Sequence, residues 1–281
     1  MKRLFQFAGG ELPLGRKTIL MGILNYTPDS FSDGEKYFTP QKAVEQAVAL
    51  QADGADILDI GCCSTRPFAV RADEKEELRR LREVLPAVRR AVSVPVSVDT
   101  YRPCVARAAL EMGAGIINDV SGAFVPEMAA VVRDYRAGWV LTHAGAPEVK
   151  TETVLSYPFG VVKDVQRFFD EMLALCEKAG LPLENVCLDP GFGFAKTDEQ
   201  NIELLKGFGE LDTHGAALLA GVSRKRFIGA LSGEAPETGR PGGTLTADLE
   251  AVRLGADILR VHDVALHRPA VLAADRLYRK L

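Results

Sequence analysis

The sequence lacks long apolar runs, is poor in aromatic residues and has no surplus of basic charge. No stretch approaches the roughly 18 consecutive apolar residues expected of a membrane-spanning helix. Aromatic residues make up 7% of the chain, and 34 lysines and arginines face 38 aspartates and glutamates, a net charge of −4. Proteins that follow a nucleic-acid backbone carry a basic surplus instead. We therefore expect neither a membrane nor a nucleic-acid partner.

Cysteine is also scarce, and its placement argues against the common cysteine frameworks. The five cysteines are an odd number, none forms a CxxC motif, and only Cys62 and Cys63 are neighbours. A disulfide framework or a zinc knuckle needs paired cysteines at regular spacing. The N-terminal segment has no apolar run of the length of a signal peptide. These features predict reduced thiols in a cytoplasmic protein.

Short apolar runs recur along the whole chain of 281 residues. They lack strict alternation of apolar and polar residues, as expected for strands that are covered on both faces. The eight runs cover residues 18–25, 56–61, 94–100, 115–120, 138–144, 185–191, 217–223 and 257–264. Segments with helical periodicity lie between them, and two carry start signals, Thr39-Pro40 and the capping box Thr197 to Gln200.

Eight strands that alternate with helices predict a (β/α)8 TIM barrel. We expect a single α/β domain over residues 1–281, with the barrel proper from about residue 18. An open doubly wound sheet is the alternative, weakened because no GxGxxG motif follows the first run. The amphipathic segment 265–280 is expected to pack on the barrel, the other possibility being a partner chain.

Polar residues stand at the end of each run, where the active site of such a barrel lies. The ends carry Asn25, Ser64-Thr65-Arg66, Asp99, Asn118-Asp119, Thr142-His143, Asp189, Ser223-Arg224-Lys225, and Arg260 with His262. Each has a plain structural reading, such as a turn at Asp189-Pro190 or a helix cap at Asn118-Asp119. Together they favour a binding site for a polar, planar or anionic molecule, because an unpaired buried polar group costs roughly 2–7 kcal/mol.

Several of these segments match one family in order and spacing. The motifs are MGILNYTPDSFSDG (21–34), DIGCCSTRP (59–67), SVDT (97–100), INDVSG (117–122), DPGFGF (189–194), GVSRKRFIG (221–229) and RVHDV (260–264). Over about residues 18–265 the chain resembles the dihydropteroate synthase family. The resemblance implies a barrel that joins 6-hydroxymethyl-7,8-dihydropterin pyrophosphate to 4-aminobenzoate, giving 7,8-dihydropteroate and pyrophosphate in folate synthesis. It also implies Mg²⁺ dependence and a homodimer, with sulfonamides as inhibitors.

The resemblance also implies roles for individual residues. Pterin binding falls to Asp99, Asn118, Asp189, Phe194, Lys225 and Arg260, of which Asp99, Lys225 and Arg260 are the catalytic candidates. Diphosphate binding falls to Asn25, Arg66, Arg260 and His262, and metal binding to Asn25, with Asp33 as a weaker addition. The aminobenzoate pocket falls to Phe31, Thr65, Pro67 and Arg226. No side-chain nucleophile is needed, so a dissociative loss of pyrophosphate before attack by the amine is our hypothesis.

The chain departs from the family pattern in places, which leaves two other functions open. Gly61-Cys62-Cys63 stands where the family usually has Gly-Gly-Glu or Gly-Ala-Glu, Phe68 replaces a frequent glycine, and Thr142 replaces a methionine. These changes predict altered affinity for aminobenzoate or sulfonamides. The missing carboxylate also suits a non-catalytic pterin-binding paralogue or partner subunit. A methyltetrahydrofolate-dependent methyltransferase is the second alternative, although it should lack the TPDSFSDG, SRK and RVHD segments.

Overall fold

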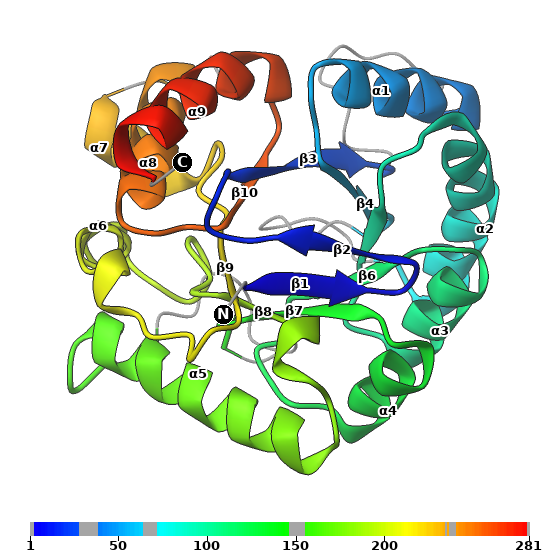
Figure 1. Cartoon of the computed structure of the whole chain (residues 1–281), viewed down its shortest axis with the longest axis horizontal. Coiled ribbons are helices and arrows are strands. Elements are labelled where there is room, and N and C mark those ends of the chain that lie inside the picture. Colours follow the sequence, from blue (N-terminus) through cyan, green and yellow to red (C-terminus); the bar gives the residue numbers. More distant parts are fainter. Residues whose placement is uncertain are drawn as a thin grey trace.

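Eight parallel strands form a closed barrel in the order β10-β3-β4-β5-β6-β7-β8-β9 (Figure 1). The computed structural model describes residues 3–27, 39–63, 72–145, 155–233, 235 and 240–279. The barrel strands are β3 Ile19–Asn25, β4 Ile57–Gly61, β5 Val96–Asp99, β6 Ile116–Asp119, β7 Gly138–Thr142, β8 Val186–Asp189, β9 Ala217–Ala220 and β10 Ile258–Val261. Each strand lies within one of the eight apolar runs, so the (β/α)8 prediction is confirmed.

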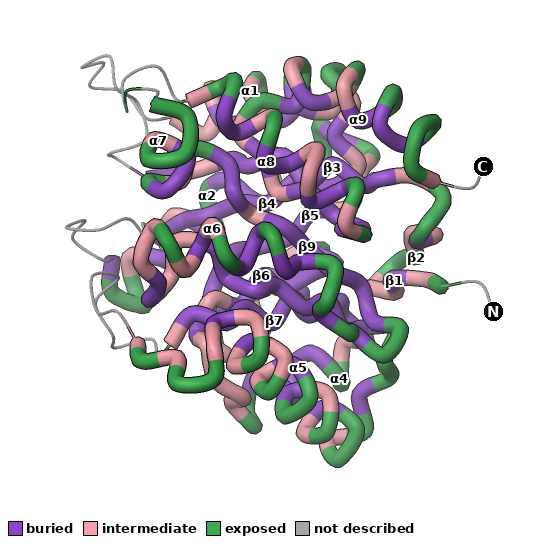
Figure 2. The backbone as a smooth tube through the Cα atoms, turned by 90° about the vertical axis from the view of Figure 1, so that its left-hand side faces the viewer, coloured by how far each residue is buried: buried purple, intermediate pink, exposed green. Residues whose placement is uncertain are grey.

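Helices surround the barrel and bury one side against it, whereas the barrel strands are buried except at Asn25 and Arg260 (Figure 2). They are α1 Pro40–Ala52, α2 Glu74–Ala91, α3 Pro103–Glu111, α4 Pro126–Tyr135, α5 Val161–Lys178, α6 Asp198–Lys206, α7 Arg226–Ser232, α8 Pro241–Arg253 and α9 Val264–Tyr278. Both predicted start signals are confirmed. Thr39 caps α1 by accepting from the Lys42 amide, and Thr197 with Gln200 forms a capping box on α6.

Alternate residues of the strands point into the barrel or out toward the helices, which makes two cores. Inward side chains such as Met21, Ile57 and Ile116 form one apolar cluster, and outward ones such as Leu20 and Leu58 join the larger cluster beneath the helices. The inward positions near the carboxyl ends of the strands are polar instead. The interior is therefore apolar at its amino-terminal end and polar at the other.

A two-stranded hairpin lies across the amino-terminal end of the barrel, and the sequence reading missed it (Figure 1). Its strands are β1 Leu4–Phe7 and β2 Gly10–Pro13. Phe5 is fully buried in the interior cluster, and Arg3 pairs with Asp257 at 2.7 Å. Gly9, Gly10 and Glu11 interrupt the apolar residues of this segment, so it has no apolar run like those of the barrel strands. The hairpin closes the apolar end of the barrel.

Helix α9 packs on the barrel as predicted. Its Val264, Val271 and Ala274 are buried, whereas Leu272 and Leu277 on the outer side are exposed. Within the described ranges, no helix combines the length and apolar character that a membrane crossing requires.

Candidate active site

The register of the strands brings the predicted polar residues together at one rim. Asn25 lies beside Gly61, Gly61 beside Asp99, and Asp99 beside Asn118. Farther round the barrel, Thr142 lies beside Asp189. Because neighbouring strands are in register, these side chains share the inner face at the carboxyl ends, where barrel enzymes bind their substrates.

Arg260 bridges two carboxylates at the centre of this rim. Its Nε donates to Asp59 Oδ2 at 2.7 Å, and its Nη2 donates to Asp99 Oδ2 at 3.1 Å. The Arg260 side chain keeps 20% of its surface exposed, so the guanidinium group is open to a ligand on one side. Asn118 joins the same network, since its Nδ2 donates to Asp59 Oδ2 at 3.0 Å.

Asp59 is a member of the network that sequence reasoning did not single out. It lies inside an apolar run rather than at its end, and its side chain is completely buried. A charge within a fully buried strand requires a partner, and this was the available signal. The partner itself, Arg260, is 201 residues away in the sequence.

Asp189 is held by the loop that follows its own strand. Its Oδ1 accepts from the Gly191 amide at 2.8 Å, and Thr142 lies at the limit of hydrogen-bond distance, 3.5 Å, from its Oδ2. Gly191 has φ +70°, and a Cβ there would lie 2.0 Å from the His143 carbonyl oxygen. The turn interpretation is therefore correct for Asp189, and the turn also fixes its carboxylate at the rim.

Lys225 and Phe194 form one wall of the site. The Lys225 ammonium group lies 4.2 Å from the centre of the Phe194 ring, a cation–π contact. Gly193 makes room for this contact, because a Cβ there would come within 2.8 Å of Lys225 Cδ. Lys225 immediately precedes α7, so its backbone position is set by the start of that helix.

Lys196 is a second residue that sequence reasoning missed. Its buried Nζ donates to the carbonyl oxygens of His143, Gly191 and Phe194 at 3.2, 3.0 and 3.2 Å, and lies 2.9 Å from His143 Nδ1. The side chain thus ties the end of β7 to the loop that carries Phe194. Nothing in the local sequence marks this lysine, because all its acceptors but one are main-chain atoms.

The remaining predicted residues divide into three groups. His262 lies at the end of β10 with its Nδ1 3.0 Å from Ser223 Oγ, and Asn25 ends β3 in a half-buried position. Arg226 points outward, 76% exposed, and pairs with Asp198 at 3.2 Å. The last group lies outside the described residues and comprises Phe31, Asp33, Thr65, Arg66, Pro67 and Phe68.

Burial perturbs the acids and bases of the rim in opposite directions. Burial raises the pKa of Asp99 to about 7, since Arg260 and Lys225 offset only part of it and Asp59 adds repulsion. Burial also raises the pKa of Asp189 and lowers that of Lys225 to about 8. Groups with displaced pKa values that meet in one place are typical of functional sites. The carboxylates of the rim can accept hydrogen bonds from N–H donors, and the neighbouring Lys225 and Arg260 can bind anions.

The comparisons with known proteins agree with this geometry. The family model described as pterin binding enzyme matches residues 21–262. Dihydropteroate synthase of Synechocystis sp. is 42% identical over 266 residues, covering 94% of this chain and 92% of that protein. The chain belongs to the dihydropteroate synthase family.

Two solved members of the dihydropteroate synthase family show the same fold. The Xanthomonas albilineans enzyme with 4-aminobenzoic acid has a TM-score of 0.90 at 40% identity, covering 99% of this chain and 98% of that one. A structure of the same enzyme in complex with 7,8-dihydropteroate has a TM-score of 0.84 at 40% identity, covering 98% of each chain.

The two cysteines that depart from the family pattern are buried. Cys63 Sγ lies 3.8 Å from the Ala72 carbonyl oxygen, and the Arg80 side chain donates to the Cys62 carbonyl at 3.2 Å. Burial, reinforced by the nearby Glu77 carboxylate, raises the pKa of both thiols. Because the thiolate is the reactive form, this position does not suit an oxidation-sensitive pair.

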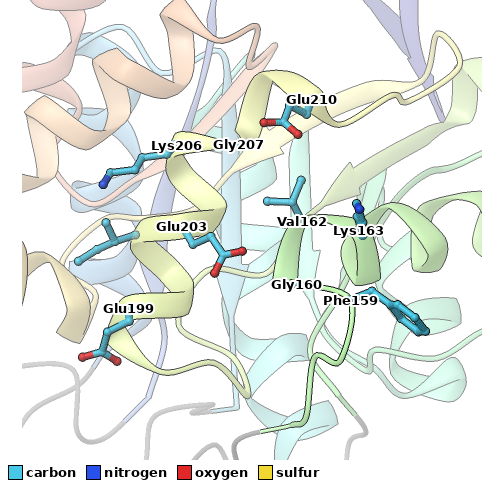
Figure 3. Close-up of a pocket in the computed structure, with 10 residues that line it drawn as sticks. Phe159, Gly160, Val162, Lys163, Glu199, Glu203, Lys206, Gly207 and Glu210 are labelled. Carbon is cyan, nitrogen blue, oxygen red and sulfur yellow. The ribbon is translucent and has the colours of Figure 1, made fainter.

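A cavity of about 610 Å³ lies elsewhere, between α5 and α6 (Figure 3). Glu199 and Glu203 come from α6, and Lys163 comes from the start of α5. None of the predicted site residues that the structure describes lines it. The barrel rim, rather than this cavity between outer helices, is therefore the candidate active site.

Proposed function

We propose that the chain catalyses the dihydropteroate synthase reaction. In this reaction the amine of 4-aminobenzoate displaces pyrophosphate from 6-hydroxymethyl-7,8-dihydropterin pyrophosphate, which gives 7,8-dihydropteroate. The observation that carries the proposal is the convergence of Asp99, Asn118, Asp189, Lys225 and Arg260 on one buried rim in a chain of this family. The relatives named dihydropteroate synthase at about 40% identity support the same reaction.

The rim residues suit the two ends of the pterin substrate. The ring edge offers N–H donors, which the Asp189 carboxylate and the Asn118 carbonyl oxygen can accept, and Lys225 can donate to the ring carbonyl. The diphosphate suits the guanidinium group of Arg260 and the ring of His262 at the end of β10. Binding would therefore orient the methylene carbon, and orientation can contribute up to roughly 7–11 kcal/mol to catalysis.

The proposed substitution is dissociative. The bond from the methylene carbon to the pyrophosphate oxygen breaks, the electron pair leaves with pyrophosphate, and the electron-rich ring takes up the positive charge. An ionised Asp99 then stabilises the cationic pterin until the amine attacks its methylene carbon and gives up a proton to solvent water. Burial opposes this ionised form, and the Arg260 guanidinium, which donates to Asp99 at 3.1 Å, lowers the pKa of Asp99 and so favours it.

Magnesium is part of the proposal. Mg²⁺ takes oxygen ligands, keeps several waters and is often held by one or two protein groups together with substrate phosphates. The Asn25 amide oxygen at the rim is a ligand of this kind, and among the described residues no group of three or more acids, histidines or cysteines is placed to hold a metal ion. The residues thus fit an ion held chiefly by the diphosphate, which would neutralise charge on the leaving group.

The proposal extends to a homodimer in the cytoplasm and to inhibition by sulfonamides, which resemble 4-aminobenzoate. All five cysteines are free, in keeping with a reducing compartment. Sedimentation equilibrium would test the dimer. A sulfonamide inhibition constant equal to that of a typical family member would argue against altered affinity at Cys62-Cys63.

Pyrophosphate release from the two substrates, measured with and without Mg²⁺, tests the function. We expect release only when both substrates and Mg²⁺ are present. Asp99→Asn should lower turnover by roughly 10²–10³-fold with little change in melting temperature, as when one electrostatic group is removed. Asp119→Asn is the matched control, because Asp119 is also buried at a strand end but binds Ser121 and Trp139 instead.

The same assay separates the alternatives. Absence of release under all conditions, with pterin binding retained, would favour the non-catalytic paralogue. Methyl transfer from methyltetrahydrofolate to a corrinoid would favour the methyltransferase. Unaltered turnover in Asp99→Asn would remove Asp99 from the mechanism.

A further inference from the structure

Asp59 is a buried carboxylate whose two donors are both substrate-binding candidates. It lies in β4, two residues before the end of the strand, and its side chain has no exposed surface. One oxygen, Oδ2, accepts from Arg260 Nε at 2.7 Å and from Asn118 Nδ2 at 3.0 Å. A buried charge is retained only with such partners, so its hydrogen bonds act on Arg260 and Asn118.

Asp59 lies deeper in the barrel than Asp99, so the two carboxylates bind different nitrogens of the Arg260 guanidinium group. Asp59 pairs in register with Ser97, two residues deeper in β5 than Asp99. Asp59 therefore holds Nε from below, while Nη2 reaches Asp99 at 3.1 Å near the rim. Because guanidinium is planar, a bond at Nε fixes its plane and still leaves the outer nitrogens to bind a ligand.

Asp59 also determines which way the Asn118 amide points. A carboxylate has only acceptor oxygens, so the atom of Asn118 that faces it must be the NH₂ group. The carbonyl oxygen of Asn118 then faces away from Asp59 and remains able to accept an N–H donor. Without Asp59, either end of the amide could take this position.

We propose that Asp59 is a positioning residue, which holds the plane of Arg260 and the amide of Asn118 in the orientation that receives the pterin pyrophosphate. It does so from beneath the site, without contact to the substrate. The inference rests on the proposed function, since Arg260 and Asn118 are assigned to substrate binding there.

The second oxygen of Asp59 makes a sharp test possible. Among the described residues, Oδ1 has no hydrogen-bond partner. An asparagine can therefore place its carbonyl oxygen at Oδ2 and its NH₂ group at Oδ1, which keeps both hydrogen bonds and removes only the charge. Ser97, the register neighbour, is also completely buried, and its Oγ likewise has no partner in the described chain. It supplies the matched control.

The experiment compares the variants Asp59→Ala, Asp59→Asn and Ser97→Ala. The dissociation constant of the pterin pyrophosphate is measured by fluorescence titration, and kcat and KM come from pyrophosphate release. Asp59→Ala should weaken pterin binding at least about tenfold, as expected when hydrogen bonds to charged groups are lost. Asp59→Asn and Ser97→Ala should bind nearly as tightly as the unaltered chain, and the KM for 4-aminobenzoate should change little in all three.

A pH profile separates positioning from a general effect on folding. The charge of Asp59 raises the pKa of Asp99, so Asp59→Asn should move the acid limb of kcat/KM to lower pH while affinity is kept. Unaltered pterin affinity in Asp59→Ala would overturn the proposal, as would a loss in Asp59→Asn as large as that in Asp59→Ala. If Asp59→Ala does not fold, Asp59→Leu, which fills the space but has no acceptor for Arg260 or Asn118, takes its place: weakened pterin affinity supports the proposal, and unaltered affinity overturns it.

Pyrophosphate release by the unaltered chain tests the proposed function separately from the role of Asp59. An unaltered chain that binds the pterin but releases no pyrophosphate would exclude the function. The comparison of dissociation constants would still decide whether Asp59 positions Arg260 and Asn118.

Discussion

Replacing Gly191 by alanine should damage both the fold and the site. Gly191 follows Asp189 in the loop after β8 and has φ +70°. The new Cβ would lie 2.0 Å from the His143 carbonyl oxygen and 2.8 Å from its carbonyl carbon. The His143 segment cannot withdraw freely, because its amide donates to the Asp189 carbonyl at 2.9 Å and Lys196 binds its carbonyl oxygen at 3.2 Å.

The expected loss of stability has two parts. A left-handed backbone costs an L-residue roughly 1–2 kcal/mol relative to glycine. Crowding against an immobile neighbour adds typically about 1–3 kcal/mol, so Gly191→Ala should lose about 2–5 kcal/mol in total. Gly233, at the end of α7, is the matched control, since its φ is +73° but a Cβ there meets no atom of the described residues within 4 Å. Gly233→Ala should therefore show only the first part.

Urea denaturation followed by circular dichroism measures the difference. The midpoint should fall in both variants at constant slope, and more in Gly191→Ala. Pterin affinity should fall in Gly191→Ala alone, because the displaced amide binds Asp189 Oδ1. Equal losses of stability in the two variants would refute the role of the clash, and unaltered pterin affinity in Gly191→Ala would refute the link from the loop to Asp189.

Four further predictions follow from buried or paired groups. Lys196→Met should raise the KM for the pterin substrate more than that for 4-aminobenzoate, because the loop that carries Phe194 loses its anchor; equal changes in steady-state kinetics would contradict this. Burial and Lys196 lower the pKa of His143 to about 3, so the unfolded chain binds an extra proton between about pH 3 and 6.5. Stability should therefore rise with pH across this window, by up to about 1.4 kcal/mol per unit, and urea midpoints of His143→Asn should rise less steeply. In a thiol titration of the native protein, Cys104 should react first, because it is exposed and the other four cysteines are buried. Arg3→Met should lower the melting temperature without changing KM, because Arg3 binds Asp257 at the end opposite the rim; a changed KM would contradict that separation.

The barrel and its polar rim could be predicted because both follow from local pattern. Each strand is a short apolar run, and Asn25, Asp99, Asn118 and Asp189 stand where those runs end. Because the sites of such barrels lie at the carboxyl ends of the strands, residues at these ends are expected to lie close together. The residue-by-residue register of the strands came only from the structure.

The residues that sequence reasoning missed depend on distant partners. Asp59 is explained by Asn118 and Arg260, 59 and 201 residues later, and Lys196 in part by the carbonyl oxygen of His143, 53 residues earlier. Main-chain acceptors have no sequence signature, so such an anchor cannot be read from residue types. The hairpin of β1 and β2 was missed for a different reason, because its short strands gain their stability from the barrel end they cover.

The bridge made by Arg260 has a consequence for how the protein is synthesised. Asp59 and Asp99 leave the ribosome well before Arg260, which follows them by 201 and 161 residues. Until β10 emerges, the nascent chain holds two neighbouring carboxylates without this cation, and β3 lacks its partner at the seam. The barrel therefore closes, and the site gains the positive charge of Arg260, in the same late step. A truncated chain that ends before β10 should remain open and sensitive to proteases. A chain that has not completed its barrel should therefore also be inactive.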